Sequence, residues 1–354
     1  MDSVKHREHR TGTDRWTHRL AWLLALLVFS LLWLGALVTT FDAGMAVPDW
    51  PTTYGHWFYP LQQWLYQVND LFLEHGHRTL AQLVGLVTIG LVWLVWRNDE
   101  RQWMRWFIVG LLLGVILQGT LGGFRVLAES ILLAKIHGCS APVVFAMCAL
   151  LVTWTSPRWR QAAGQNTPGQ AVAAHGAAVQ AAEQRTAKGP TKPATTSPRR
   201  WAAGIPWVSV LVATGIYALI VLGVQLRQQP PTADPFWFQL WLWTKLLLIP
   251  LVAVGVGWLP WVIAGQGGGV PGRRAVGWLI GVFSLQVLLG LGTWVVNYGF
   301  PMWFTDWVYP IEYTVVREGA LQVWVTTAHM AVGALAFALA LVTTAWTWLP
   351  AEVE

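Results

Sequence analysis

The chain contains few charged residues, and this shortage limits the classes of protein to which it can belong. Asp, Glu, Lys and Arg make up 11% of the 354 residues, and 55% of the residues are hydrophobic. A soluble domain carries about 25% charged residues. The composition therefore excludes a soluble enzyme, a disordered chain and a coiled coil. It favours an all-α membrane protein with several spanning helices.

Cysteine is also scarce, with two copies, Cys139 and Cys148. Nine residues apart on one predicted helix, they are separated by a rise of about 13.5 Å. Because the Cα atoms of a disulfide lie within about 7 Å, these two cysteines cannot pair with each other. The sequence thus excludes a disulfide scaffold.

Tryptophan, by contrast, is abundant, with 26 copies, and it is typical of the interface between membrane and water. Apolar runs of spanning length predict eight transmembrane helices. These runs cover residues 19–41, 70–96, 104–124, 131–155, 204–226, 236–264, 274–296 and 321–349.

The net charge of +6 is interpreted as an orientation signal and not as a nucleic-acid site. Seventeen of the 23 Lys and Arg residues fall on one side of the predicted spans. The positive-inside rule makes that side cytoplasmic, with both termini inside. A multi-pass membrane protein is expected, in contact with lipid and not with nucleic acid.

The composition changes in residues 156–203, where Ala, Gln, Thr, Pro and Gly dominate. We expect a flexible cytoplasmic linker there. It would join two pseudo-repeated four-helix bundles, residues 19–155 and 204–349. Residues 1–18 would form a cytoplasmic arm and residues 350–354 a short tail.

Ionisable side chains inside membrane spans are costly and usually functional. Among those in the even-numbered predicted spans, the candidates are Glu74, His77, Arg78, His137, Lys245 and His329. The three histidines are expected at a common depth of about 10 Å below the outer surface. Three histidines at one depth on alternate helices indicate a common function.

Neutral imidazole is a strong iron ligand, and facing helices can hold a flat macrocycle between two histidines. His77 and His137 form the natural pair in the first half. Glu74 lies three residues before His77 on the same helix face, and Arg78 and Arg125 are candidates to bind haem propionates. Covalent c-type haem is excluded because the chain has no C-x-x-C-H motif.

Structural alternatives exist for each of these residues. A single intramembrane histidine often forms a hydrogen bond to a neighbouring helix, so His329 is either a haem ligand or a structural residue of this kind. Arg78 at i,i+4 would serve equally well to neutralise Glu74. His75 points away from His77, which favours an interfacial position.

Several motifs resemble the haem A synthase family, over nearly all of the chain apart from the N-terminal arm and the linker. The first half carries Pro48-Asp-Trp-Pro51, Glu74-x-x-His-Arg78, and Gln118-Gly-x-Leu-Gly-Gly123 followed by Arg125 and His137. The second half carries Gln286-x-x-Leu-Gly-x-Gly292 and Ala328-His329.

The resemblance implies an oxidoreductase that converts the C8 methyl of haem O to a formyl group, which gives haem A for cytochrome oxidase. It implies substrate haem on His77 and His137 near the outer face, Glu74 as the catalytic carboxylate, and a haem b in the second half. Implied partners are haem O synthase and cytochrome oxidase assembly factors. Homo-oligomerisation is left open.

The chain departs from the family pattern in its sixth span, which contains no histidine. Trp243, Thr244 and Lys245 stand at the matching depth. His329 would then share the haem b iron with Lys245, bind it as the only protein ligand, or lie at an empty site. An interfacial Lys245, or one paired with a propionate, is a further interpretation.

Two other functions compete with a haem A synthase. A non-catalytic haem-b cytochrome that carries electrons from quinol would need the histidines but not Glu74. A transporter built from repeats would bind no haem.

Overall fold

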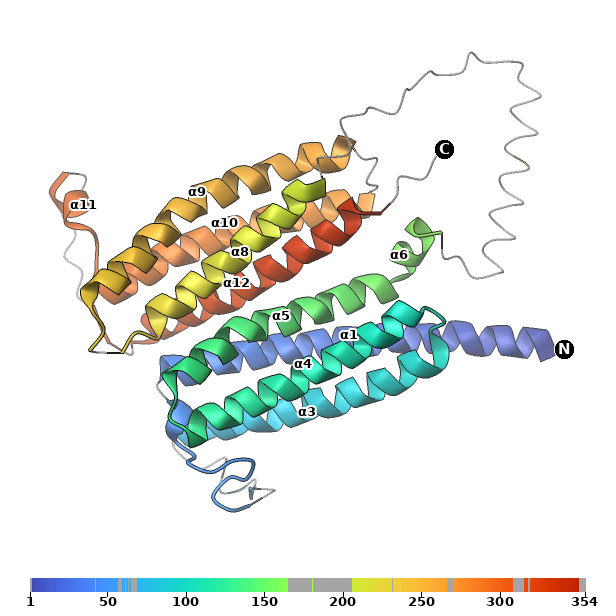
Figure 1. Cartoon of the computed structure of the whole chain (residues 1–354), viewed down its shortest axis with the longest axis horizontal. Coiled ribbons are helices and arrows are strands. Elements are labelled where there is room, and N and C mark those ends of the chain that lie inside the picture. The colour runs from blue at the N-terminus through green and yellow to red at the C-terminus, as the bar shows by residue number, and fades with distance from the viewer. Residues whose placement is uncertain are drawn as a thin grey trace, which may run out of the picture.

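The structure, a computed structural model, describes residues 2–41, 43–56, 59–60, 62, 64, 69–164, 180, 206–230, 232–265, 270–307, 315–317 and 319–349. Helices dominate it (Figure 1), and the described residues include a single isolated β-bridge, between Thr53 and His56. The predicted all-α class is confirmed.

In the part of the chain that the structure describes, eight helices are long and apolar enough to cross a membrane, with mean hydropathies of 1.8 to 2.4. Seven of them coincide with predicted spans to within a few residues, and the first ends near its predicted end but begins at Asp2, ahead of the predicted start. A long uninterrupted apolar run in lipid satisfies its backbone hydrogen bonds within a helix. The spanning helices are α1 (Asp2–Thr40), α3 (Asn69–Asn98), α4 (Gln102–Leu127), α5 (Ile131–Thr155), α8 (Pro206–Arg227), α9 (Pro235–Gly265), α10 (Val270–Tyr298) and α12 (Ala320–Thr347).

Local polar residues set several helix ends. The Ser130 side chain accepts a hydrogen bond from the amide of Leu133 at the start of α5, as an N-cap does. Ser156 follows the end of α5 and caps the short helix α6 (Pro157–Ala162). Gly299, with φ of +80°, follows α10 in the left-handed conformation that glycine tolerates.

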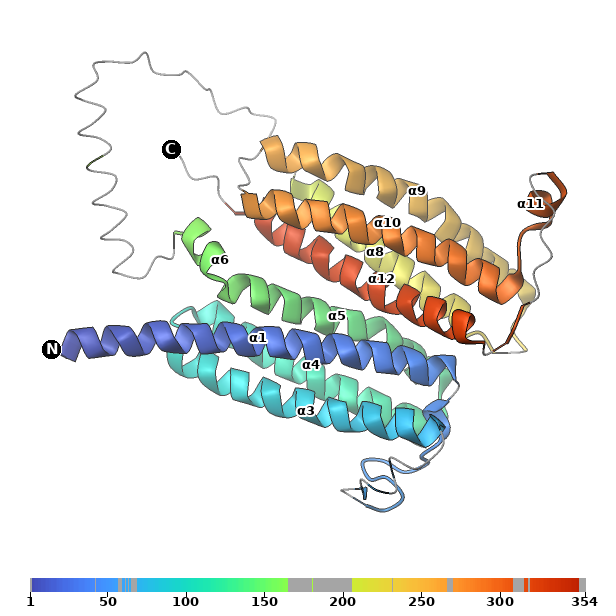
Figure 2. The ribbon, with the colours of Figure 1, turned by 180° about the vertical axis from the view of Figure 1, so that it is seen from behind.

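The helices form two neighbouring groups of four (Figures 1 and 2). In one group α1 packs on α3 and α5, and α4 packs on α3 and α5. In the other group α12 and α9 each pack on α8 and α10. Across the boundary α12 contacts α5 and α1, and α5 contacts α8.

α12 packs closely against its neighbouring helices because many of its buried side chains are small. Its buried positions include Ala331, Gly333, Ala334, Ala336 and Ala338, and small residues let helix backbones approach closely in membranes. Large apolar side chains from the surrounding helices fill the remaining space, so one hydrophobic core runs through both groups.

The segments outside the spans add detail that the apolar runs do not predict. α1 already begins at Asp2, within the stretch expected to be an arm. Two further short helices, η1 (Ala43–Met45) and α11 (Met302–Trp307), lie between spanning helices. The expected linker is described at residues 156–164 and 180 alone, and the expected tail lies outside the described residues.

Candidate functional site

In the first group of helices, two histidines each pack against a glycine of a neighbouring helix. The position that a Cβ atom would take on Gly35 of α1 lies 3.0 Å from Cε1 of His77 on α3. The same position on Gly122 of α4 lies 3.3 Å from Cε1 of His137 on α5. Each imidazole therefore uses space that a side chain on the facing helix would take.

The second group repeats this arrangement. The Cβ position of Gly290 on α10 lies 3.1 Å from Cε1 of His329 on α12. Gly122 and Gly290 each stand four residues after a glutamine, Gln118 and Gln286. The weak sequence repeat thus corresponds to a repeated contact between histidine and glycine.

The Nδ1 atoms of His77, His137 and His329 are buried and make no hydrogen bond of standard geometry among the described residues, although the backbones of Leu31, Gln118 and Gln286 lie close enough to interact with the three rings. Buried polar atoms are normally paired, and either imidazole nitrogen is able to bind iron. Rings packed on glycines in this way fit the donor set of a haem iron, with one ring nitrogen facing a neighbouring backbone and the other left to bind. In the described part of the chain, no three His, Cys, Asp or Glu side chains gather as a site for a bare metal ion.

Arg125, near the end of α4, lies beside this first pair of histidines. His77 and His137 interact electrostatically with each other, and Arg125 acts on both. Its guanidinium lies against Gly44, whose Cβ position is 2.9 Å from Nη2, and its buried Nε has no partner among the described residues. Arg125 is therefore placed to hold an anion next to the histidines.

Glu74 and Arg78 form an i,i+4 ion pair on α3, with 2.6 Å between Oε1 and Nη2. The pair also binds the loop before α3. The amide of Val47 donates to Oε2 of Glu74 (2.9 Å), and Arg78 donates to the carbonyls of Val47 (3.0 Å), Asp49 (2.7 Å) and Thr52 (2.9 Å). Glu74, 3% exposed, thus reaches the site as part of a buried network.

This network changes the interpretation of Arg78. Its two terminal nitrogens donate to three backbone carbonyls and to Glu74, which is the pairing considered as the structural alternative. A propionate-binding role for Arg78 stays a prediction, and Arg125 has more donors available for that task.

The loop itself, residues 46–56, is braced on Asp49. The Asp49 carboxylate accepts hydrogen bonds from the amides of Tyr54 (2.8 Å) and Gly55 (2.9 Å) and from the hydroxyl of Thr52. Burial raises the pKa of Asp49, but these hydrogen bonds outweigh it and lower the pKa to about 2.

The loop also contacts two spanning helices. The indole of Trp50 packs directly on Gly123 of α4, where a Cβ atom would overlap the ring. The Thr53 hydroxyl lies 3.1 Å from Nδ1 of His75 on α3. His75 therefore faces the loop, as its interfacial assignment expects.

In α9, the three residues at the depth of the missing histidine point in different directions. Trp243 is 63% exposed, and the Thr244 hydroxyl bonds to the carbonyl of Leu240 in its own helix. Nζ of Lys245 instead lies 3.3 Å from the Cβ position of Gly223 on α8.

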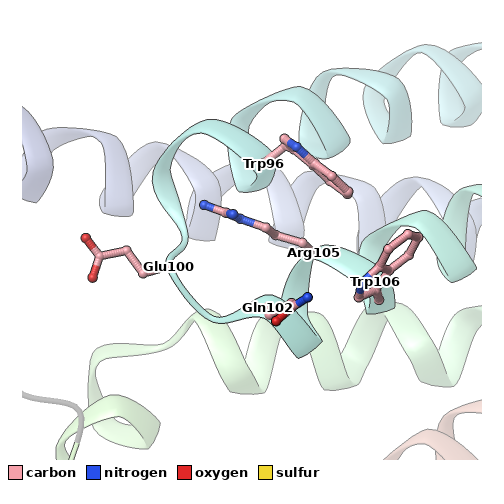
Figure 3. A pocket seen from close by; sticks show the side chains of 5 residues that line it. All are labelled: Trp96, Glu100, Gln102, Arg105 and Trp106. Atoms are coloured by element: carbon pink, nitrogen blue, oxygen red, sulfur yellow. The ribbon is translucent and has the colours of Figure 1, made fainter.

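The structure also has a hollow of about 370 Å³ where α3 joins α4, at the end of the bundle away from the loop 46–56. Trp96, Glu100, Gln102, Arg105 and Trp106 line it, and Glu100 points away from the two tryptophans (Figure 3). None of the predicted site residues contributes to this hollow.

Sequence reasoning missed the glycines on the facing helices, Gly35 and Gly223, and the amide of Val47. A glycine inside a helix costs about 0.5–1 kcal/mol relative to alanine. That cost was the available signal that another group approaches closely at Gly35 and Gly223. No side-chain pattern could have revealed the role of a backbone amide.

Residues 18–184 match the model of a family described as cytochrome oxidase assembly protein. The match begins within α1 and runs past the end of α6, so it includes every site residue of the first group of helices.

Curated relatives carry two kinds of name. A heme A synthase of Shewanella oneidensis is 32% identical over 157 residues, 40% of this chain and 47% of the relative. A heme A synthase of Hyphomonas neptunium is 26% identical over 135 residues, 31% of this chain and 38% of the relative. A protoheme IX farnesyltransferase of Halobacterium salinarum is 30% identical over 132 residues, 37% of this chain and 28% of the relative. The chain therefore spans less than half the length of each of these relatives.

Proposed function

We propose that the chain acts as a haem A synthase, and the match of residues 18–184 to the family model described as cytochrome oxidase assembly protein supports this. In this proposal it oxidises the C8 methyl of haem O to a formyl group and so makes haem A for cytochrome oxidase. Two relatives named heme A synthase support the assignment.

The observation that carries the proposal is the grouping of His77, His137 and Glu74 in the first group of helices. Two imidazoles packed on glycines of facing helices supply nitrogen donors for iron, and a buried carboxylate stands one helical turn from one of them. A cytochrome needs the imidazoles but has no use for a carboxylate beside them, whereas in a synthase Glu74 would serve the reaction in addition to pairing with Arg78.

In the proposed site, haem O is the substrate, and its iron and porphyrin provide the redox chemistry. His77 and His137 hold the iron and fix the position of the ring. Arg125 binds a propionate with its free donors, as arginine commonly binds carboxylates. The loop 46–56, anchored on Glu74 and Arg78, covers the end of the site against water.

Glu74 has the catalytic role in this proposal. Written with water as the oxygen donor, the methyl group and one water give the formyl group, four protons and four electrons, and an external electron acceptor must take up the electrons. A carboxylate close to that carbon accepts protons and stabilises positive charge on the oxidised carbon.

The second group of helices holds a haem b on His329 in this proposal. His137 and His329 lie on α5 and α12, which pack against each other across the boundary between the groups. A haem on each would give electrons a short path between the two halves of the chain.

The chain is proposed to lie in the bacterial inner membrane, with both termini cytoplasmic and the haem sites towards the outer face. Haem O synthase and cytochrome oxidase assembly factors are the proposed partners, since haem O must be supplied and haem A passed on.

The test is haem extraction and mass analysis of membranes that contain the full chain together with a haem O synthase. We expect haem A with the wild type and none with Glu74→Gln, which keeps an oxygen to accept the Val47 amide but removes the charge. Asp70→Asn, at an exposed carboxylate on the same helix, is the matched control and should still give haem A.

The same variant separates the synthase from a cytochrome. Glu74→Gln protein that still binds haem but makes no haem A supports the synthase. Haem A formation at the wild-type rate in Glu74→Gln would contradict the catalytic role of Glu74.

A further inference from the structure

Lys245 occupies, in the second group of helices, the place that His77 occupies in the first. His77 projects from α3 onto Gly35, five residues before the end of α1, and Lys245 projects from α9 onto Gly223, four residues before the end of α8. Each glycine lies on the first spanning helix of its group, and each facing side chain lies on the second. His77 and Lys245 thus each pack on a glycine of the neighbouring helix, at equivalent places in the two groups.

The comparison extends to the opposite side of each group. His137 meets Gly122 and His329 meets Gly290, in the third and fourth spanning helices of their groups. If the first pair of side chains flanks one macrocycle, the same geometry places Lys245 and His329 on either side of a second. Lys245 is also close enough to His329 to act electrostatically on its imidazole.

Lys245 has no partner that would explain a charged amine at this depth. Among the described residues it has neither an ion pair nor a hydrogen bond. The other cation that acts on His329, Arg227, is of the same sign and donates to Thr40 of α1 (2.9 Å). An unpaired ammonium within a span is costly, so three roles fit the amine: reaching the outer interface, pairing with an anion, or binding as a neutral ligand.

We propose that Nζ of Lys245 is the axial iron ligand opposite His329, so that the haem of the second group is held by one imidazole and one amine. The inference rests on the proposed function insofar as that function places a haem there. When the iron binds, the nitrogen lone pair forms the coordinate bond and the proton of the ammonium passes to water. The second group lies beyond residues 18–184, the part of the chain that matches the family.

The chief competing role for Lys245 is a charge partner for a haem propionate. That role needs the amine charged and leaves the iron with His329 as its single protein ligand. The two roles predict different coordination of the second iron, and coordination is visible in its spin state without any measurement of activity.

The experiment uses the full chain purified with its haem. Haem content is measured by the pyridine haemochrome method and ligation by low-temperature EPR. The wild type should give two low-spin signals, one bis-imidazole and one distinct from it, and His137→Ala should remove the bis-imidazole signal. Lys245→Leu should convert the other signal to high spin, whereas Lys245→His should convert it to a second bis-imidazole signal. Thr244→Val, on the adjacent exposed residue, should change neither.

Three results would overturn the inference. One is an unchanged spectrum in Lys245→Leu at equal haem content. Another is a wild type with two bis-imidazole signals or with no second haem. The third is loss of the second haem in Lys245→Leu that Lys245→His fails to restore.

The outcome is separable from the proposed function. A chain that makes no haem A, but whose second signal responds to Lys245→Leu, would contradict the synthase activity and keep the ligand. A chain that makes haem A, with a spectrum indifferent to Lys245, would keep the activity and contradict the ligand.

Discussion

At the scale of single residues, the positions of the histidines depend on what stands opposite them. Gly35, Gly122 and Gly290 each leave room for one imidazole, with Cβ positions 3.0 to 3.3 Å from Cε1. Real Cβ atoms rarely come so close to a neighbour. The glycine therefore sets where the ring lies, and through it the nitrogen.

Gly122→Ala tests this dependence directly. The added methyl should push the His137 ring by a few tenths of an ångström and lower haem affinity in the first group by about 10-fold, the lower end of what loss of a ligand-orienting contact costs. The matched control is Gly119→Ala on the same helix, where an added Cβ meets no atom within 4 Å. Haem titration should separate the two variants, and equal affinities would show that the cradle does not position the ring.

At the scale of elements, the loop 46–56 is held to the helices by charged groups and an aromatic ring. Glu74 and Arg78 bind its backbone, Trp50 fills the notch at Gly123, and Asp49 closes its turn. The side chains that hold the loop can be read from the sequence. Which backbone groups they bind depends on the fold.

Asp49 gives the loop a definite pH dependence. Its folded pKa of about 2 lies below the ordinary value of 3.8, so its carboxylate stabilises the loop above about pH 4 and this contribution is lost as the pH falls towards 2. Between about pH 5 and 8, hydrogen exchange of the Tyr54 and Gly55 amides should show constant protection. Asp49→Asn should speed it about 10-fold at every pH in that range, since a charge-assisted hydrogen bond contributes about 1.5 kcal/mol or more. Equal exchange in Asp49→Asn and wild type would contradict the bracing role.

The spanning helices were predictable because length and hydropathy alone determine them. The spans predicted at 131–155 and 236–264 agree with α5 and α9 to within a residue. The short helices α6 and α11 were not predictable, since local caps and packing decide such segments. Likewise, Lys245 could be placed at a depth from the sequence, but its direction towards Gly223 required the packing of α8 against α9.

At the scale of the whole molecule, close packing of α5 against α8 and α12 brings the two groups of helices together. The Tyr217 hydroxyl of α8 donates to the carbonyl of Cys139 on α5 (3.2 Å). Beside it, the Cβ position of Gly138 lies 3.6 Å from the nearest atoms of Val224. The small size of Gly138 therefore allows the contact next to His137.

A graded series at Gly138 tests this boundary. Gly138→Ala should leave stability nearly unchanged because its methyl makes an ordinary contact. Gly138→Ile should overpack the boundary by about 1–3 kcal/mol and lower the midpoint of thermal unfolding by several degrees. The double variant Gly138→Ile with Val224→Ala should recover much of the loss. A Gly138→Ile variant as stable as Gly138→Ala would show that the two groups do not meet here.

The central claim is that the first group of helices converts haem O to haem A at Glu74, His77 and His137. The most direct measurement follows haem O and haem A by mass in membranes that hold the full chain and a supply of haem O. In the wild type haem O should fall as haem A rises, and Glu74→Gln should abolish both changes. Haem O that stays bound and unaltered in the wild type would contradict this claim.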